Sequence, residues 1–129
     1  MSKQHKPLEP VSLEERTMGT LAEEAFRRLT IGDTGLIVSL GEDDAPRRHG
    51  VSLDPRTEAL VRIGALIALD APPASFRCAV EAAQRVGVRQ EDLLATLMAV
   101  AGLVGTPRLV SAAPRIALAA GYDVEAALE

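Results

Sequence analysis

The sequence predicts an all-α protein folded as a compact bundle of about six helices. Apolar residues recur at the three- and four-residue spacing of helices along most of the chain, and proline, glycine and aspartate stand where such stretches would begin or end. A chain of 129 residues is long enough to bury a core without disulfides or metals. We therefore expect a flexible N-terminal arm over residues 1–11 and a single helical domain over residues 12–129.

The first part of the chain carries one strong helix signal. Ser12 and Glu15 fit a capping box, so we expect a first helix from Ser12 to about Leu29. Residues 36–40 are apolar but too few for their spacing to separate a strand from a buried helical turn, and we favour a helix because the surroundings are helical. Residues 41–50 mix acids and arginines around a proline, which predicts an exposed loop.

Four consecutive helices are predicted in the second part. Aspartate followed by proline at Asp54 and Pro55 is a helix start, and prolines and glycines mark the later boundaries. The expected ranges are residues 54–70, 73–86, 91–104 and 107–120, with Pro114 kinking the last one. Residues 63–69 are apolar on all sides, so we expect them at the centre of the bundle or under another subunit, and we expect the helix over residues 91–104 to be mostly buried. Both stretches are apolar on more than one face, which a monomer of this size could not hide, so we expect an oligomer.

Composition excludes several classes of function. The net charge of −4 and the scattered basic residues argue against nucleic-acid binding. The longest apolar run, residues 63–69, is too short to cross a bilayer, and no apolar stretch follows Lys3 and Lys6 as it would in a secretory signal. A single cysteine, Cys78, cannot form an intrachain disulfide or a thiolate metal cluster. We expect a cytoplasmic protein with no cofactor and no bound metal.

Four short motifs in the second part resemble the carboxymuconolactone decarboxylase family, which includes the alkylhydroperoxidase D-like proteins. They are Leu-Asp-Pro-Arg-Thr at residues 53–57, Ala-x-x-x-Gly-Val at 83–88, Glu-Asp-Leu-Leu at 91–94 and Gly-Thr-Pro-Arg at 105–108. The resemblance implies an all-helical fold and a homo-oligomer, either a trimer or a hexamer. It also implies one of two activities, lactone decarboxylation or peroxide reduction.

The chain departs from the resembled family at its chemical residues. Redox members carry Cys-x-x-Cys-x-x-x-His on the second helix, where a low-pKa thiolate attacks peroxide, a second cysteine resolves the product and a histidine moves the proton. Neither possible register of this motif provides a cysteine pair or a histidine; the positions are Pro72, Ser75 and Ala79, or Ala71, Ala74 and Cys78. The histidine of the decarboxylase pattern is missing as well, so neither reaction carries over directly.

A candidate pocket is nevertheless expected where helices 54–70 and 73–86 cross, because the resembled family has its chemistry there. The polar or soft residues nearest to that crossing are Glu58, Arg62, Ser75 and Cys78. Arg62 would pair with a carboxylate ligand, and Ser75 would offer a hydroxyl and free backbone N–H groups at a helix start. Alternatively, Glu58 and Arg62 form only a surface ion pair, and Cys78 is a small apolar residue packed between helices.

The remaining chemistry-bearing residues are interpreted with their alternatives. His5 and His49 fall in segments expected to be irregular, so His49 either folds over a pocket or is solvated. Arg77, Glu81 and Arg85 stand four residues apart, as on a solvent-facing or subunit-contacting helix face. Arg108 and Arg115 would either recognise a carboxylate or be solvated near helix ends.

The sequence thus predicts a divergent family member without the Cys-x-x-Cys motif, which binds or transforms a small carboxylate or lactone-like metabolite in a pocket between subunits. If the chain is an enzyme, the resemblance implies a decarboxylase-like lyase. Two other hypotheses stay open: a peroxidase-type antioxidant protein that uses Cys78 alone, and a non-catalytic structural or regulatory oligomer.

Overall fold

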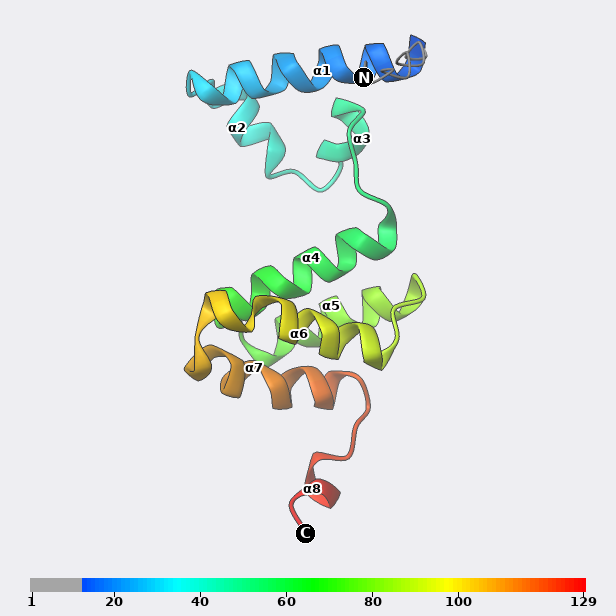
Figure 1. The fold of residues 1–129 in the computed structure, drawn as a ribbon, viewed down its shortest axis with the longest axis vertical. Helices are drawn as coiled ribbons and strands as arrows, with labels where there is room; N and C mark the ends of the chain where they lie inside the picture. Colours follow the sequence, from blue (N-terminus) through cyan, green and yellow to red (C-terminus); the bar gives the residue numbers. More distant parts are fainter. Residues whose placement is uncertain (1–12) are drawn as a thin grey trace, which may run out of the picture. The chain divides into compact units, whose positions relative to one another are not determined.

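The computed structural model describes residues 13–129, which form eight helices and no strand (Figure 1). The helices are α1 (Leu13–Thr30), α2 (Thr34–Leu40), α3 (Ala45–His49), α4 (Pro55–Ala68), α5 (Pro73–Arg85), α6 (Gln90–Val104), α7 (Thr106–Ala119) and α8 (Val124–Ala127). The all-α prediction is confirmed. The expected arm over residues 1–11 and the capping residue Ser12 lie outside the described residues. The chain divides into two compact units, which meet between Ser52 and Leu53 in the sequence, and each is described separately below.

The first unit consists of α1, α2 and α3. The preference for a helix over residues 36–40 is confirmed, because α2 covers this run. Its first turn is capped by Asp33, whose Oδ1 accepts the N–H of Leu36 at 3.1 Å. Among the side chains of this unit that are described, only Leu36 and Ala45 belong to the buried apolar residues.

The loop predicted over residues 41–50 is partly wrong, because Ala45–His49 form the short helix α3. Proline is compatible with the first turn of a helix, so Pro46 does not prevent this turn. Gly50 ends the helix with φ of +69°, a conformation that glycine adopts without steric cost. His49 therefore closes a helix and does not lie in an irregular segment.

The second unit packs α4, α5, α6 and α7 around one apolar core. Helix α4 is central, since it contacts α5, α6 and α7. The core residues are Ile63, Ile67, Ala71, Phe76, Val80, Ala83, Val88, Leu93, Ala112 and Ile116. Most are aliphatic or alanine, as expected from an aromatic content of 2%. At Gly64 the missing side chain leaves α4 close to Val100 on α6.

The predicted start of α4 at Asp54 and Pro55 is confirmed. Asp54 accepts the N–H of Thr57 at 3.0 Å and the hydroxyl of the same residue at 2.9 Å. These hydrogen bonds, first that of the Thr57 hydroxyl, lower the pKa of the Asp54 carboxyl, because they favour its charged form.

The C-terminal end of α4 is fixed by side chains of α7. Arg108 Nε donates to the carbonyl of Ala68 at 2.7 Å, and Arg115 Nη1 donates to the carbonyl of Ala71 at 2.6 Å. The Ser111 hydroxyl donates to Asp70 at 2.8 Å, and Asp70 itself has φ of +51°. Helix ends leave unpaired carbonyls, and these donors satisfy part of that need. The arginines thus bind backbone carbonyls of a neighbouring helix end, which neither interpretation of the sequence anticipated.

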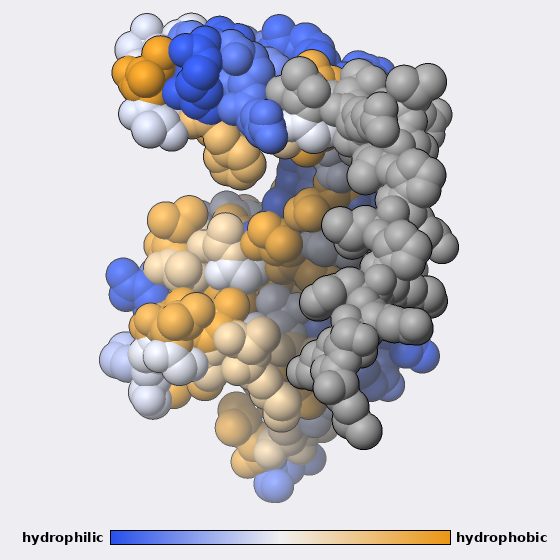
Figure 2. Space-filling model, turned by 45° about the horizontal axis from the view of Figure 1, so that its top comes forward, coloured by the Kyte–Doolittle hydropathy of each residue, from blue (hydrophilic) through white to orange (hydrophobic). Residues whose placement is uncertain are grey.

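The expectation that α6 is mostly buried is wrong for a single chain. Only Leu93 of this helix is fully buried, whereas Leu94, Met98 and Leu103 are exposed, Leu103 by 88%. From Leu93 to Val104 the helix has no charged residue. Figure 2 shows apolar residues over much of the visible surface of the second unit. A helix that is apolar on all sides cannot bury every side against its two main neighbours, α4 and α7, so part of it faces outwards.

Candidate functional site

An open hollow of about 580 Å³ lies between α4 and α5. Its walls are formed by Pro55, Glu58, Ala59, Arg62, Ala65, Leu66, Cys78, Ala79, Ala82 and Val86. Most of these residues are small or aliphatic, and only Glu58 and Arg62 bring charge. Three of the four residues named from the sequence, Glu58, Arg62 and Cys78, thus line the same hollow.

The charged residues of the hollow are paired with each other. Arg62 Nη2 lies 2.8 Å from Glu58 Oε1, as the four-residue spacing on one helix allows. The Arg62 side chain is 63% exposed, so the pair lies in a well-solvated position and is weak as a source of stability. Only this one contact of the guanidinium appears among the described residues, which leaves other N–H groups for a ligand.

Cys78 is exposed on the α5 wall of the hollow. It is therefore not packed between helices, as the alternative interpretation of the sequence had it. Ser75 does not line the hollow, although it stands three residues before Cys78 on the same helix. The α5 wall is a stripe formed by Cys78, Ala79, Ala82 and Val86, and Ser75 lies one turn beyond its end.

The first turn of α4, which carries Pro55 and Glu58 to the hollow, is held to the start of α6 by an ion pair. Arg56 Nη2 lies 2.5 Å from Asp92 Oδ1, and Asp92 Oδ2 accepts the backbone N–H of Arg89 at 2.8 Å. The Arg89 N–H, followed by the Arg56 side chain, lowers the pKa of Asp92. Both carboxylate oxygens are engaged in these contacts, so Asp92 positions the wall of the site and is not available as a base.

The other residues singled out from the sequence lie elsewhere. Arg77 and Glu81 line a second groove together with Arg115, and His49 lines a hollow within the first unit. A further apolar hollow between α6 and α7 includes Tyr122, which nothing in the sequence had marked. The sequence feature that could have indicated this hollow is the set of leucines in α6. Composition alone, however, does not tell which of these leucines face outwards.

Two further observations concern residues 13–129. Among the side chains that the structure describes, those of residue 19 and residues 21–129, no group of three or more histidine, cysteine, aspartate or glutamate residues is placed to hold a metal ion. None of the helices there is long and apolar enough to cross a membrane.

The comparisons with known proteins agree with the four sequence motifs. The sequence profile of the Carboxymuconolactone decarboxylase family matches residues 37–119, which is more than half of the chain and includes both walls of the α4–α5 hollow. Neither a curated protein nor a solved structure matches this chain. The matched segment also contains the all-helical core of the second unit. The chain belongs to the carboxymuconolactone decarboxylase family.

Proposed function

We propose that this protein binds, and in one version of the hypothesis transforms, a small apolar carboxylate or lactone-like metabolite in the α4–α5 hollow. The observation that carries the proposal is the meeting of Glu58, Arg62 and Cys78 on the walls of one hollow that is otherwise apolar. Ligand sites are usually apolar concavities with a few converging polar groups, and a volume of about 580 Å³ is in their range.

Arg62 is the residue proposed to recognise the ligand. A guanidinium matches the two oxygens of a carboxylate, and it can also donate to the carbonyl of a lactone. Glu58 holds the guanidinium on the α4 side of the hollow in the absence of ligand. Ser75 lies outside the wall, so its proposed contribution of a hydroxyl and backbone N–H groups requires a ligand that extends beyond the N-terminal end of the α5 stripe.

The decisive experiment is a calorimetric titration of wild-type protein and Arg62→Ala. The ligand comes from a panel of small carboxylates and lactones screened by native mass spectrometry. If Arg62 binds the ligand, Arg62→Ala should weaken binding by about 1.5–3 kcal/mol, the usual value for hydrogen bonds to a charged group. Arg77→Ala is the matched control, because Arg77 is an exposed arginine of α5 that does not line this hollow. If Arg62→Ala leaves the affinity unchanged and lowers the free energy of unfolding by less than about 1 kcal/mol, the Glu58–Arg62 ion pair is a surface contact only.

We infer further that a second copy of the chain covers the apolar face of α6. Monomeric proteins rarely expose a continuous apolar helix face, and members of the family are commonly oligomeric. Light scattering after size-exclusion chromatography should give a mass several times 13.6 kDa. Met98→Glu, which adds a charge to this face, should shift the protein towards monomer, whereas Gln84→Glu on the exposed face of α5 should not. A monomeric wild type at micromolar concentration contradicts the inference.

A second function is favoured by the exposure of Cys78 on the hollow, namely peroxide reduction by a single cysteine. This chemistry needs an external thiol to resolve the oxidised cysteine, because the chain has no other. Under our main proposal, peroxide turnover with a dithiol reductant stays at background for wild type and Cys78→Ser alike. Turnover by wild type that disappears in Cys78→Ser would favour the antioxidant function instead.

A further inference from the structure

The first unit contains a separate, partly open hollow of about 440 Å³, lined by residues of α1, α2 and α3 and by Val51. Its apolar lining includes Leu21, Leu29, Leu36 and Leu40. Helix α1 lies outside residues 37–119, which match the family, whereas Leu40, α3 and Val51 lie within them. No residue of this hollow is shared with the α4–α5 hollow. Its polar lining residues are Glu24, Arg28, Arg48 and His49, whereas the charged residues of the α4–α5 hollow are Glu58 and Arg62.

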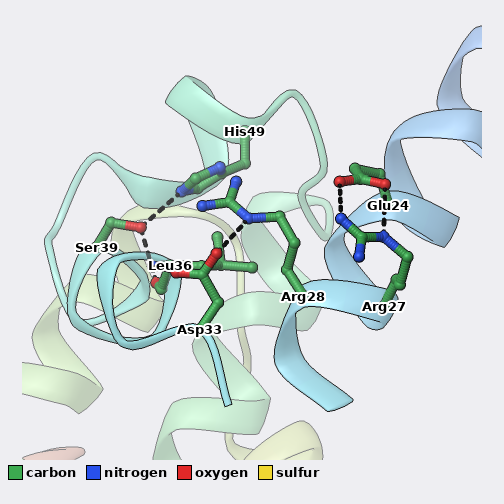
Figure 3. A network of polar contacts seen from close by, with 7 residues as sticks. All are labelled: Glu24, Arg27, Arg28, Asp33, Leu36, Ser39 and His49. Carbon is green, nitrogen blue, oxygen red and sulfur yellow. Dashed lines mark hydrogen bonds and ion pairs between the residues drawn. The ribbon is translucent and has the colours of Figure 1, made fainter. Parts of the chain in front are cut away.

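The hydrogen-bond acceptors beside this hollow are already occupied (Figure 3). Asp33 accepts the N–H of Leu36 on Oδ1 and Arg28 Nε on Oδ2, the latter at 2.8 Å. Glu24 accepts two donors from Arg27, one on each carboxylate oxygen, at 2.7 and 3.1 Å. None of these four oxygens is left without a donor.

The Ser39 hydroxyl takes part in two contacts beside the hollow. The Ser39 hydroxyl donates its only proton to the carbonyl of Leu36 at 2.8 Å. While the hydroxyl donates to Leu36, the contact of 3.1 Å between Ser39 Oγ and His49 Nε2 has the imidazole N–H as its donor.

Donors, by contrast, remain available on Arg28. Its Nε binds Asp33, and no partner of its two terminal nitrogens occurs among the side chains that the structure describes. In Figure 3 these nitrogens point away from Asp33, on the side of Ser39 and His49. The hydrogen bond that Arg28 donates to Asp33 raises the pKa of Arg28, so the guanidinium stays charged. Arg48, the other arginine of the lining, is engaged by Glu42 and Asp44.

From this arrangement we infer that the hollow of the first unit is a binding site for an amphipathic monocarboxylate, with an alkyl body on the leucines of α1 and α2 and its head group on the terminal nitrogens of Arg28. The end of a guanidinium offers two parallel N–H donors, which a carboxylate accepts with both oxygens. An amine head group carries the same sign of charge as the guanidinium, and an alcohol would satisfy one donor in place of two.

The first test compares three ligands on the unmodified full-length protein. Octanoate, octanol and octylamine share the same alkyl body, and amide chemical shifts report both affinity and location. Octanoate should bind about tenfold more tightly than octanol, in line with hydrogen bonds to a charged group, and octylamine should bind more weakly than octanoate. The shifted amides should lie within residues 21–51. Equal affinities for octanoate and octanol, or shifts confined to residues 55–86, would overturn the inference.

The second test uses two matched pairs of variants. Arg28→Gln should weaken octanoate binding about tenfold, while Arg47→Gln, which changes an exposed arginine of α3 outside the lining, should leave it unchanged. Leu40→Gln should weaken binding of both octanoate and octanol, while Val38→Gln, an exposed position on the same helix outside the lining, should not.

These outcomes separate the new site from the proposed α4–α5 site. Arg62→Ala should bind octanoate like wild type, because Arg62 lies in the other unit. Arg28→Gln could disturb the fold, which a loss of helical circular dichroism would show. In that case the comparison of Leu40→Gln with Val38→Gln and the comparison of the three ligands test the inference. Octanoate binding that is lost in Arg62→Ala and kept in Arg28→Gln assigns the ligand to the α4–α5 hollow and refutes the inference.

Discussion

The two units of the chain are stabilised in different ways. The second unit has a core of ten buried apolar residues that joins four helices. The first has two among its described side chains, Leu36 and Ala45, and is otherwise held by the Asp33 cap, the Arg28–Asp33 ion pair and the Ser39–His49 hydrogen bond. Burial of apolar surface is the larger contribution to stability, whereas exposed ion pairs and caps contribute little each. The second unit is thus the scaffold of the protein, and the first is the part most sensitive to its surroundings.

The two phenylalanines of the chain give the strongest test of this difference. Phe76 in α5 is fully buried, and Phe26 in α1 is 70% exposed. Phe76→Ala should lower the free energy of unfolding by about 3–5 kcal/mol, the cost of a large cavity in a core. Phe26→Ala should change it by less than about 0.5 kcal/mol. Urea denaturation followed by circular dichroism measures both free energies of unfolding. If the two variants lose similar amounts, the two units do not differ as described and another surface covers Phe26.

A smaller effect is expected at Gly64, where α4 approaches α6. A Cβ added there would lie 3.5 Å from Val100 Cγ1 and 3.9 Å from Thr96 Cγ2, which are ordinary contact distances. Gly64→Ala should therefore stabilise the second unit by up to about 1 kcal/mol through helix propensity. Gly64→Leu has no space and should cost about 1–3 kcal/mol. If thermal unfolding shows Gly64→Leu to be as stable as Gly64→Ala, the helices are less tightly packed than described.

The smallest expected effect is a difference in acid sensitivity. The pKa of Asp33 is lowered by the Arg28 side chain and by the Leu36 N–H. A lowered folded-state pKa gives stability that is present above the ordinary aspartate pKa of about 4 and is lost as the pH falls through the lowered value. The Asp54 pKa is lowered too, but its unit retains an apolar core. Acidification below pH of about 4 should thus unfold residues 21–40 before residues 55–119.

Amide hydrogen exchange across this pH range resolves the two units. Asp33→Asn keeps a residue that caps helices well but removes the titrating group, so it should make the first unit less sensitive to acid. Asp54→Asn is the matched control in the second unit. Simultaneous loss of protection in both units would mean that they unfold as one.

The sequence allowed the helices of the second unit to be predicted closely. Asp54 with Pro55, the pair Pro72-Pro73, and Gly105 with Pro107 mark boundaries because they act locally, through caps and fixed backbone angles. Helix α3 was missed because a single turn has no periodicity, and Pro46 occurs as readily in a loop as in a first turn. The exposed face of α6 was also missed, since apolar composition does not tell whether the cover comes from the same chain.

The candidate site was predictable in part. Glu58, Arg62 and Cys78 were placed together because the resembled family has its chemistry at the crossing of these two helices, and they are among the polar or soft residues nearest to it. Ser75 was misplaced by one turn, because the length over which two helices enclose a hollow depends on their crossing, which spacing does not give. The donors of Arg28 could not be predicted at all, since they depend on which atom of its guanidinium binds Asp33.

The contacts of Arg108 and Arg115 with the end of α4 also constrain the order in which this protein acquires its structure during synthesis. They join groups that are 40 and 44 residues apart in the sequence. Two core residues, Ala112 and Ile116, belong to the same helix, α7. The last turn of α4 and the core therefore remain incomplete until α7 has left the ribosome. The chain must lose the entropy of closing this long segment before those contacts can stabilise it. Until then the growing chain exposes the apolar faces of α4, α5 and α6 together, which makes this the stage at which it depends most on protection from aggregation.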